Sequence, residues 1–239
     1  MAITVSRRKA GLLIGAVVLG AVAADEPSPT RDAASVTRND ISQAMAGART
    51  IFCRFVQDRH LALFQEPLRS EGYLCFLRPG RVRWETTIPY RSILVSDGNG
   101  VAQFEWSDDR WKKLDLGLSI ALEQVLSQIA GVMEGNFASD RRGYSATVTS
   151  EADGPKIVLI PQNEKIRKMM ASIEVHVSAD MKGTRRVVLR ETGGDYTEIR
   201  FEDQVINGIL PERTFDLRNP IDIASIRDAV TAPNSSTRP

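Results

Sequence analysis

The chain has 239 residues, enough for one sizeable domain or at most two small ones. Its 31 Lys and Arg residues against 30 Asp and Glu residues give a net charge of +1, which gives no support to a nucleic-acid-binding protein or to a polybasic membrane patch. With 42% hydrophobic and 26% charged residues, the composition is that of an ordinary folded, soluble protein. Composition and charge therefore do not identify a partner.

The N-terminus has the three parts of a signal peptide. Basic residues at 7–9 precede an apolar run over 10–22, and Ala21-Val22-Ala23 is a small-x-small cleavage site. The apolar run is about 13 residues long, which is too short to span a bilayer comfortably. An uncleaved anchor is the alternative, and the paired arginines also leave twin-arginine export open beside the better-fitting general secretory route. We expect residues 1–23 to be removed near Ala23 and the mature protein to be soluble and periplasmic.

The mature chain begins with a polar segment over 24–36 that contains Pro, Ser and Asp, and we expect this segment to be a disordered linker. The folded domain is predicted over 37–222. It opens with a helix that runs from an N-cap at Thr37 or Asn39 to about Gly47 and carries apolar residues on one stripe. Residues 223–239 are predicted to be a flexible C-terminal tail.

The region 72–98 has the clearest strand pattern in the chain. Three apolar segments are broken at 78–80, at 88–89 and at 97–98, where Pro and Gly start turns. Further strands are predicted over 50–60, 101–106, 111–114, 144–150, 156–160, 173–179, 185–192 and 196–205, with a last strand around 215–217. Because almost all of these strands, about ten or eleven, are joined by hairpin-length loops, we expect antiparallel neighbours.

Between the two groups of strands, residues 118–133 follow a helical period, with apolar side chains at i, i+4, i+7, i+8 and i+11. A short helix or kinked crossover is predicted over 163–170. The only apolar surfaces that can cover such a large sheet are the helices at 39–47 and 118–133. An α+β fold is therefore predicted, in which a strongly curved antiparallel sheet with two or three helices in its mouth encloses an apolar cavity.

The two cysteines, Cys53 and Cys75, lie on neighbouring predicted strands, and an exported protein can carry a disulfide. A symmetric hairpin centred on Phe64 would place them opposite each other. The alternation of apolar residues instead points Cys53 toward the core and Cys75 outward. Because a shift of one residue in register reverses the faces, a disulfide and two buried free thiols both remain open.

Residues with obvious chemistry are few. His60 and His176 have no metal-ligand spacing and are interpreted as surface residues of strands, and the many Asp and Glu residues as solvated faces. Ser119 lacks the second Gly of a nucleophile elbow, and no phosphate-binding loop or dinucleotide motif is present. We therefore predict no enzyme activity, no cofactor and no metal; a hydrolase that uses Ser119 is the weakest alternative.

Several motifs occur in a characteristic order. They are Phe55-x-Gln57, Leu74-x-Phe76-x-Arg78-Pro79, Arg83-Trp84-Glu85, Pro89, Ser92-Ile93-Leu94-Val95-Ser96-Asp97-Gly98, Leu159-Ile160-Pro161 and Phe215. Over residues 37–222 the chain resembles the LolA-like family, the periplasmic carriers of outer-membrane lipoproteins. The resemblance implies an incomplete antiparallel β-barrel closed by helices, with an apolar cavity for lipoprotein acyl chains. It also implies a monomer whose partners are acylated lipoproteins or other lipids, an inner-membrane lipoprotein-releasing ABC transporter and an outer-membrane acceptor.

The resemblance also names candidate site residues. In the family, the arginine of the Arg-Pro motif contacts the helical lid, and the matching residue here is Arg78, whose guanidinium can donate to helix-end carbonyls. The alternative is that Arg78 only caps a strand end near a carboxylate. Candidates for the cavity wall, which could equally be plain core, are Phe55, Leu74, Phe76, Val82, Trp84, Met45, Leu122 and Leu126.

Two departures from the family pattern leave the cargo open. The strand after the Asp-Gly turn is less aromatic, with Val101-Ala102-Gln103-Phe104, and the first loop is rich in Leu rather than Gly, with Leu61, Leu63 and Phe64. Both could reshape the mouth of the pocket. The alternative function is a non-enzymatic periplasmic module that binds another lipid or a glycolipid, in trafficking or in envelope sensing.

Overall fold

The computed structural model describes residues 36–114, 119–137 and 143–232, without the side chains of 119–125. The predicted signal peptide and nearly all of the predicted linker lie outside these ranges. Within them, the chain forms one 11-stranded sheet together with four α-helices and one 3-10 helix. The strands are β1 Thr50–His60, β2 Leu68–Leu77, β3 Arg81–Ile88, β4 Ser92–Ser96, β5 Val101–Ser107, β6 Arg110–Lys113, β7 Tyr144–Glu151, β8 Gly154–Pro161, β9 Met170–Val177, β10 Thr184–Glu191 and β11 Tyr196–Ile206.

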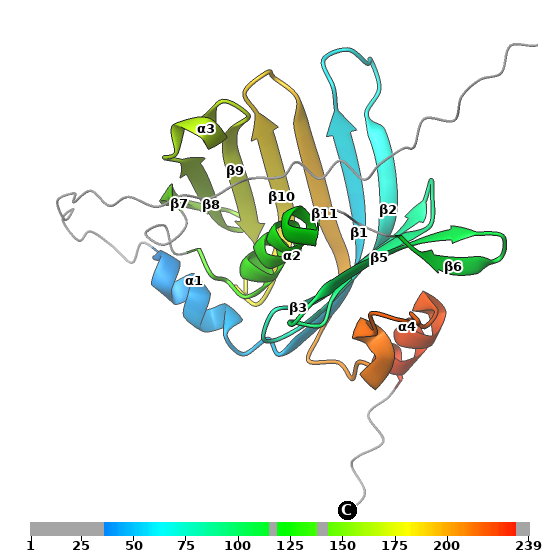
Figure 1. Ribbon diagram of the computed structural model, residues 1–239. Helices are drawn as coiled ribbons and strands as arrows, with labels where there is room; N and C mark the ends of the chain where they lie inside the picture. Colours follow the sequence, from blue (N-terminus) through cyan, green and yellow to red (C-terminus); the bar gives the residue numbers. More distant parts are fainter. Residues whose placement is uncertain (1–35, 115–118, 138–142, 233–239) are drawn as a thin grey trace, which may run out of the picture.

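The order of the strands explains why a helix crosses the sheet. The order is β6-β5-β4-β3-β2-β1-β11-β10-β9-β8-β7, and every pair with a register is antiparallel. The first and last strands are therefore neighbours in the middle, while β6 and β7 form the two edges. A single connection joins those edges, and helix α2 (Ser119–Met133) is part of it. Figure 1 shows α2 lying in front of the strongly curved sheet, so the predicted fold is confirmed.

Helix α1 (Arg38–Met45) lies on the same concave side as α2. Its start is fixed by a capping box, in which the Asp40 backbone N–H donates to Thr37 Oγ1 at 3.2 Å and the Thr37 N–H donates to the Asp40 carboxylate at 2.8 Å. The helix buries Ile41 and Met45 in the larger of two apolar clusters, which lies on the concave face and includes side chains from both helices. We call this group the concave cluster.

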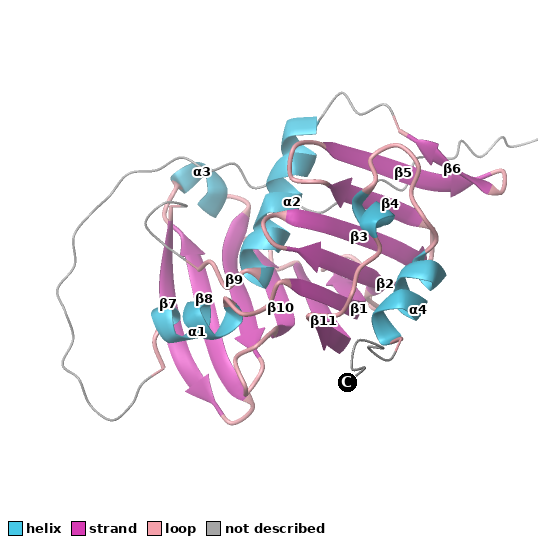
Figure 2. Ribbon diagram, turned by 90° about the horizontal axis from the view of Figure 1, so that it is seen from below, coloured by secondary structure: helices cyan, strands magenta, loops and turns pink. Residues whose placement is uncertain are grey.

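A second apolar cluster lies on the convex face, over β1–β5 (Figure 2). We call it the convex cluster; it is covered by the 3-10 helix η1 (Glu212–Phe215) and by helix α4 (Ile223–Thr231). The predicted flexible tail is therefore wrong for residues 223–231, and the predicted strand around 215–217 is wrong as well. The apolar stripe of α4, which buries Ile226 and Val230, is too short to stand out in the sequence.

The two cysteines are free and buried. In the β1–β2 register, Cys53 faces Leu74 and Cys75 faces Phe52, so the two thiols are one residue away from direct opposition. Cys53 belongs to the concave cluster, whereas Cys75 is covered by the convex cluster instead of pointing into solvent. Burial raises the pKa of both thiols, to about 12 for Cys75. The structure thus contains two inert thiols on opposite faces of the sheet.

A short helix forms the connection between β8 and β9. Helix α3 (Glu164–Arg167) occupies the predicted crossover between β8 and β9 and is capped by Asn163, whose side chain accepts from the Lys165 N–H at 2.9 Å. In the described part of the chain, no helix combines the length and the apolar character needed to cross a membrane.

Candidate functional site

The wall of the concave face is built by the strands of the first half of the chain. Phe55, Leu74, Phe76, Val82 and Trp84, all predicted as wall residues, are buried in the concave cluster. The Phe55 and Trp84 rings stack with centroids 3.9 Å apart. The alternation of the strands therefore assigns the correct face to all five residues.

Gly72 makes the aromatic stack possible. It faces Phe55 across the β1–β2 pair, and a Cβ at Gly72 would lie 2.8 Å from Phe55 Cζ and 1.9 Å from the Glu85 carbonyl oxygen. Any side chain at this position would push apart Phe55 and strand β3. The glycine therefore lets an aromatic ring lie flat across a closely approached backbone.

The helices complete the concave cluster. Met45 of α1 and Leu126 of α2, both predicted for the site, are buried with the wall residues, whereas the side chain of Leu122 lies outside the described residues. The structure thus brings together seven of the predicted apolar residues. Their contact with a ligand stays a prediction.

The second half of the sheet contributes apolar residues that were not among the predicted site residues. Trp84 meets Phe201 edge-on at 6.3 Å. Strands β7–β11 also place partly exposed apolar side chains against the concave cluster, namely Ala146, Val148, Leu159, Leu189 and Ile199. For Ile199 the signal was present in the sequence, since Ile199 and Phe201 alternate with charged residues, whereas Leu189 follows two other apolar residues, Val187 and Val188. Most of the family motifs lie in the first half of the chain, which is why the predicted site residues come from there.

Arg78 lies beside the C-terminal ends of the helices α1 and α2. Its Nε donates to the Ala48 carbonyl at 3.2 Å, and Nη2 donates to the carbonyls of Met45 at 3.2 Å and Glu134 at 3.4 Å. The last carbonyls of a helix have no partner within the helix and attract cations. Neither α1 nor α2 has a basic residue in its last turn, so Arg78 supplies the cation for both. None of the three acceptors is a carboxylate.

The ends of α1 and α2 also contact each other directly. Ser42 Oγ donates to the Gly135 carbonyl at 2.5 Å, and the Gly80 N–H donates to Glu134 Oε1 at 3.1 Å. Gly135 has φ +67°, and a Cβ there would lie 2.9 Å from Met45 Cβ, so only glycine fits without strain. Helix α1, helix α2 and the turn after β2 therefore form one junction around Arg78.

A pocket of about 440 Å³ opens beside this junction, between α2 and the turns that follow β2 and β4. Small residues of α2 and of the turns dominate its lining, which consists of Pro79, Gly80, Ser96, Gly98, Asn99, Gly100, Val101, Ser127, Ala130, Gly131 and Glu134. Its volume is within the range of small-molecule sites. Helix α2 therefore faces the turns here through small side chains, which leave space between them.

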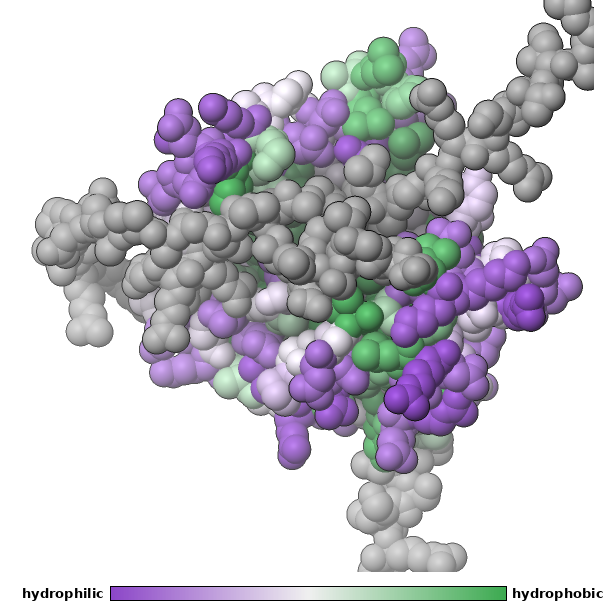
Figure 3. All heavy atoms as spheres, in the orientation of Figure 1, coloured by the Kyte–Doolittle hydropathy of each residue, from purple (hydrophilic) through white to green (hydrophobic). Residues whose placement is uncertain are grey.

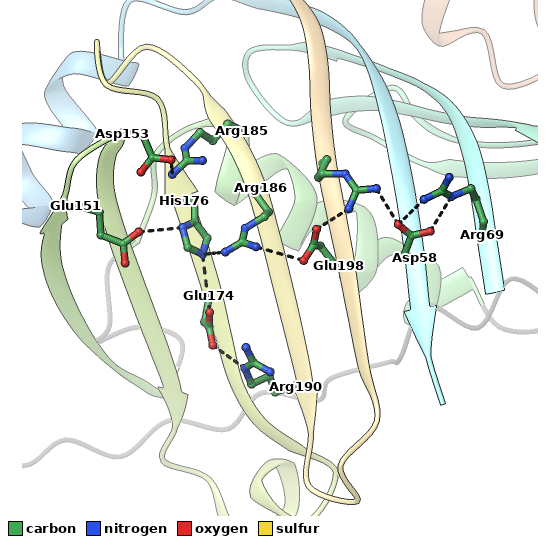
Figure 4. Close-up of polar contacts among 11 residues, drawn as sticks. Asp58, Arg69, Glu151, Asp153, Glu174, His176, Arg185, Arg186, Arg190 and Glu198 are labelled. Atoms are coloured by element: carbon green, nitrogen blue, oxygen red, sulfur yellow. Dashed lines mark hydrogen bonds and ion pairs between the residues drawn. The ribbon is translucent and has the colours of Figure 1, made fainter. Parts of the chain in front are cut away.

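The convex face of β7–β11, β1 and β2 has an entirely different character. Ionic side chains follow one another across the strands (Figure 4). They form the pairs Asp58–Arg69, Asp58–Arg200, Arg200–Glu198, Glu198–Arg186, Arg186–His176, His176–Glu151, His176–Glu174, Glu174–Arg190 and Arg185–Asp153. We call this series the convex ladder. Apart from the His176 ring, which lies between Arg186 and two glutamates, the side chains of the ladder pair opposite charges, so this face presents paired charge.

Two residues of the ladder correct predictions from the sequence. Asp58 and His176 are 4% exposed each, not solvated. Hydrogen bonds from Arg69 and Arg200 lower the pKa of Asp58 to about 2. Burial and the neighbouring Arg186 lower the pKa of His176, whose Nε2 lies 3.0 Å from Arg186 Nη2. The other histidine, His60, is partly exposed as expected and stacks on Tyr196 with centroids 4.2 Å apart.

A buried ion pair fastens the C-terminal segment to the convex cluster. Arg83 donates to Glu85 Oε2 from Nε at 3.0 Å and from Nη2 at 2.6 Å, and also to the carbonyls of Thr214 at 3.2 Å and Ile221 at 2.7 Å. Neither Arg83 nor Glu85 is exposed, although Glu85 was predicted to be solvated. Burial raises the pKa of Glu85, and the charge of Arg83 opposes that rise.

Among the described residues, no group of three His, Cys, Asp or Glu side chains could hold a metal ion. The features that these residues do present are an apolar concave face, two helices that cover it and an arginine that joins the helix ends.

The profile of the family described as "Outer membrane lipoprotein carrier protein LolA" matches residues 46–218. The chain belongs to this family. The match spans the whole sheet, helix α2 and Arg78, and it begins just after α1, so the resemblance noted from the motifs is confirmed. The LolA-family likeness is therefore carried by both halves of the sheet, including β7–β11, which the motifs covered only weakly.

Individual LolA relatives are distant. The chain is 25% identical over 213 residues to the outer-membrane lipoprotein carrier protein of Pseudomonas entomophila, with 87% of this chain and 93% of that protein covered. It is 24% identical over 188 residues to the protein of the same description from Dechloromonas aromatica, covering 74% and 80%. The match to the Coxiella burnetii carrier protein is 25% identical over 135 residues and spans 59% of that protein's length.

Solved structures are more distant still. A putative outer-membrane lipoprotein-sorting protein domain from Vibrio parahaemolyticus is 10% identical with a TM-score of 0.40, covering 74% of this chain and 94% of that chain. In the Pseudomonas aeruginosa MucA/MucB complex the matching chain is 16% identical with a TM-score of 0.37, covering 74% and 60%.

Proposed function

We propose that this protein is a non-enzymatic periplasmic carrier that shields the acyl chains of lipoproteins between its concave sheet and the helices α1 and α2. It accepts the lipoprotein from an inner-membrane ABC transporter and passes it to an acceptor at the outer membrane. The observation that carries the proposal is the junction at Arg78. There the guanidinium donates to three carbonyls at and beyond the ends of α1 and α2, the two helices that we propose as a lid over the apolar concave face. Membership of the LolA family supports it.

The energies involved are compatible with a lid that opens for cargo. Burying an acyl chain contributes about 0.8 kcal/mol per methylene, so a chain of about a dozen methylenes gains roughly 10 kcal/mol. A hydrogen bond from a charged group contributes about 1.5–3 kcal/mol, so the three bonds of Arg78, which water can replace in part, contribute less than about 9 kcal/mol together. Because the gain from the acyl chain exceeds the contribution of these bonds, cargo can displace the lid. The small residues along α2 beside the pocket, Ser127, Ala130 and Gly131, leave α2 little packing to lose there.

The test uses the purified mature protein and inner-membrane vesicles that contain the transporter and a labelled outer-membrane lipoprotein. We expect ATP-dependent appearance of the lipoprotein in the soluble fraction, bound to this protein, followed by transfer to outer-membrane vesicles. If the protein neither retains lipid nor releases lipoproteins from the vesicles, the proposal is wrong.

A matched pair of variants separates the concave face from general effects. Leu189 is partly exposed in the concave cluster, and Leu189→Arg should abolish cargo binding because it places a charge where acyl chains would lie. Ile209 is 64% exposed beyond the end of β11, and Ile209→Arg should leave cargo binding unchanged.

Mass spectrometry of the lipids that co-purify from the periplasm identifies the cargo class. Triacylated protein N-termini would support the lipoprotein carrier. Glycolipids or free lipids would instead support the alternative of a binding module for another lipid.

A further inference from the structure

The large apolar side chains that the structure leaves exposed are not scattered. Eight are exposed in the described part of the chain, and seven of them lie at or next to strand ends on one side of the sheet. They belong to the β1–β2 loop and the start of β2 (Leu63, Phe64, Leu68), to the turn between β3 and β4 (Ile88, Tyr90) and to the ends of β8 and β9 beside α3 (Ile160, Met169). Because neighbouring strands are antiparallel, the ends of β1, β3 and β8 lie on the same side of the sheet as the starts of β2, β4 and β9. We call this side of the sheet, with its seven exposed apolar residues, the apolar rim.

The β1–β2 loop is held so that it presents its apolar side chains outward. The Phe64 N–H donates to the Leu61 carbonyl at 2.9 Å, which closes a tight turn, and the Ala62 N–H donates to Asp195 Oδ1 at 2.8 Å. The second bond ties the loop to the turn between β10 and β11. Leu63 is nevertheless 88% exposed and Phe64 53% exposed. Figure 3 shows hydrophobic residues gathered over this loop at the upper edge of the molecule.

Basic and aromatic side chains accompany the apolar ones along the rim. Lys165, Arg167 and Lys168 are exposed on and just after α3, next to Met169, and only Glu164 opposes them on that helix. Tyr90 is 71% exposed at the β3–β4 turn. Apolar tips flanked by aromatic rings and Lys or Arg are typical of segments that lie in the membrane interface. The tips are spread over separate strand ends, which fits a flat surface better than a single partner helix.

We propose that the apolar rim docks this protein on the surface of a lipid bilayer, with Leu63 and Phe64 inserted between headgroups and the basic residues of α3 facing anionic lipids. The rim is separate from the concave face and from Arg78, so the proposal goes beyond the proposed function and can be tested without cargo. Docking of this kind would bring the carrier to a membrane directly, without the help of a protein receptor.

The test is flotation of the mature protein with vesicles of phosphatidylethanolamine and phosphatidylglycerol in a ratio of about 3:1, and with vesicles of phosphatidylcholine alone. We expect the wild type to float with the first and more weakly with the second. The double variant Leu63→Ser/Phe64→Ser should bind at least about tenfold more weakly, because it removes the buried apolar area. Ile209→Ser is the matched control, since it removes an exposed apolar residue away from the rim, and should bind within about twofold of the wild type.

Three outcomes would overturn the proposal. The wild type could fail to float with either vesicle, or Ile209→Ser could lose as much binding as the rim variant. Alternatively, the protein could bind native outer-membrane vesicles only and lose that binding after protease treatment, which would assign the rim to a protein partner. All variants replace exposed residues, and equal urea midpoints would confirm that they are folded.

A separate measurement keeps the two proposals distinguishable. Binding of a synthetic triacylated lipopeptide in solution should be the same for the wild type and for Leu63→Ser/Phe64→Ser, because no membrane is present. If the wild type binds vesicles but does not bind the lipopeptide, the carrier function is wrong and the proposal for the apolar rim stands.

Discussion

Two arginines on opposite faces of the sheet fasten distant segments to it by different means. Arg78 holds the lid on the concave face through three neutral carbonyls at 3.2–3.4 Å and is partly exposed. Arg83 holds the C-terminal segment on the convex face through the Glu85 carboxylate at 2.6 and 3.0 Å and two carbonyls, with no exposure. Both arginines are charged donors, but only Arg83 also faces an opposite charge, and the attraction between opposite charges is stronger where water is excluded. The C-terminal segment is thus held to the sheet more strongly at Arg83 than the helices α1 and α2 are held at Arg78.

The largest effect is expected at the stronger attachment, Arg83. Arg83→Met removes the partner of a buried carboxylate, which typically destabilises a protein by about 3–5 kcal/mol. We expect a loss of this size in urea denaturation at neutral pH, together with faster proteolysis in residues 207–232. The double variant Arg83→Met/Glu85→Met should recover much of the loss, because it leaves no unpaired charge. If Arg83→Met lowers the free energy of unfolding by less than Arg78→Leu does, Arg83 is the weaker of the two attachments and the comparison is wrong.

Removing the most strongly paired carboxylate of the convex ladder should have the next largest effect. The pKa of Asp58 is lowered to about 2 from an ordinary value of 3.8, and one pKa unit corresponds to about 1.4 kcal/mol, so the ionised carboxylate contributes about 2 kcal/mol. Its folded pKa lies below its unfolded pKa, so this stability is fully present above about pH 5 and disappears as the pH falls toward 2. Asp58→Asn should therefore lose about 2 kcal/mol in urea denaturation at pH 7 and little near pH 2. A loss independent of pH would assign the effect to packing.

Opening the lid should affect stability less and cargo more. Arg78→Leu removes donors to helix-end carbonyls that water can reach in part, and we expect it to cost about 1 kcal/mol. Uptake of an apolar fluorescent probe should increase, because the closed lid loses its fastening relative to the open one. Arg78→Lys keeps the positive charge but loses the planar guanidinium that reaches several carbonyls at once. Its probe uptake should lie between those of the wild type and Arg78→Leu. If Arg78→Leu leaves both probe uptake and lipoprotein transfer unchanged, Arg78 is only structural.

The smallest effect is expected at His176 in the convex ladder. Burial and Arg186 lower its pKa, while Glu151 and Glu174 oppose that shift and Arg185 adds to it. Because the folded pKa is below the unfolded one, the neutral ring stabilises the fold above about pH 6.5, and this stability declines as the pH falls below that value. His176→Gln should flatten the stability profile between pH 7 and pH 5, by less than the Asp58 effect. A profile identical to the wild type would show that His176 does not titrate with folding.

The pattern of apolar residues was enough to predict which face of a strand its residues occupy. The alternation of residues assigned Phe55, Leu74, Phe76, Val82 and Trp84 to one face, because successive side chains of a strand point to opposite sides. Hairpin-length loops determined that neighbouring strands are antiparallel, and the helical period of 118–133 gave α2 within a residue of its observed bounds. These are local properties, encoded over a few consecutive residues.

Contacts between residues far apart in the chain could not be predicted in this way, because they depend on how the strands pair and how the sheet curves. The pairing of β1 with β11 places the two edges at β6 and β7 and sends α2 across the concave face. The β1–β2 register places the two cysteines one residue out of direct opposition. Helix α4 packs on the convex cluster, and Arg83 is buried beneath the C-terminal segment. Arg78 acquires its acceptors from Met45, Ala48 and Glu134, which no local pattern relates to it. A periodic sequence specifies a face to be covered, but the residues that cover it depend on how the whole sheet curves and closes.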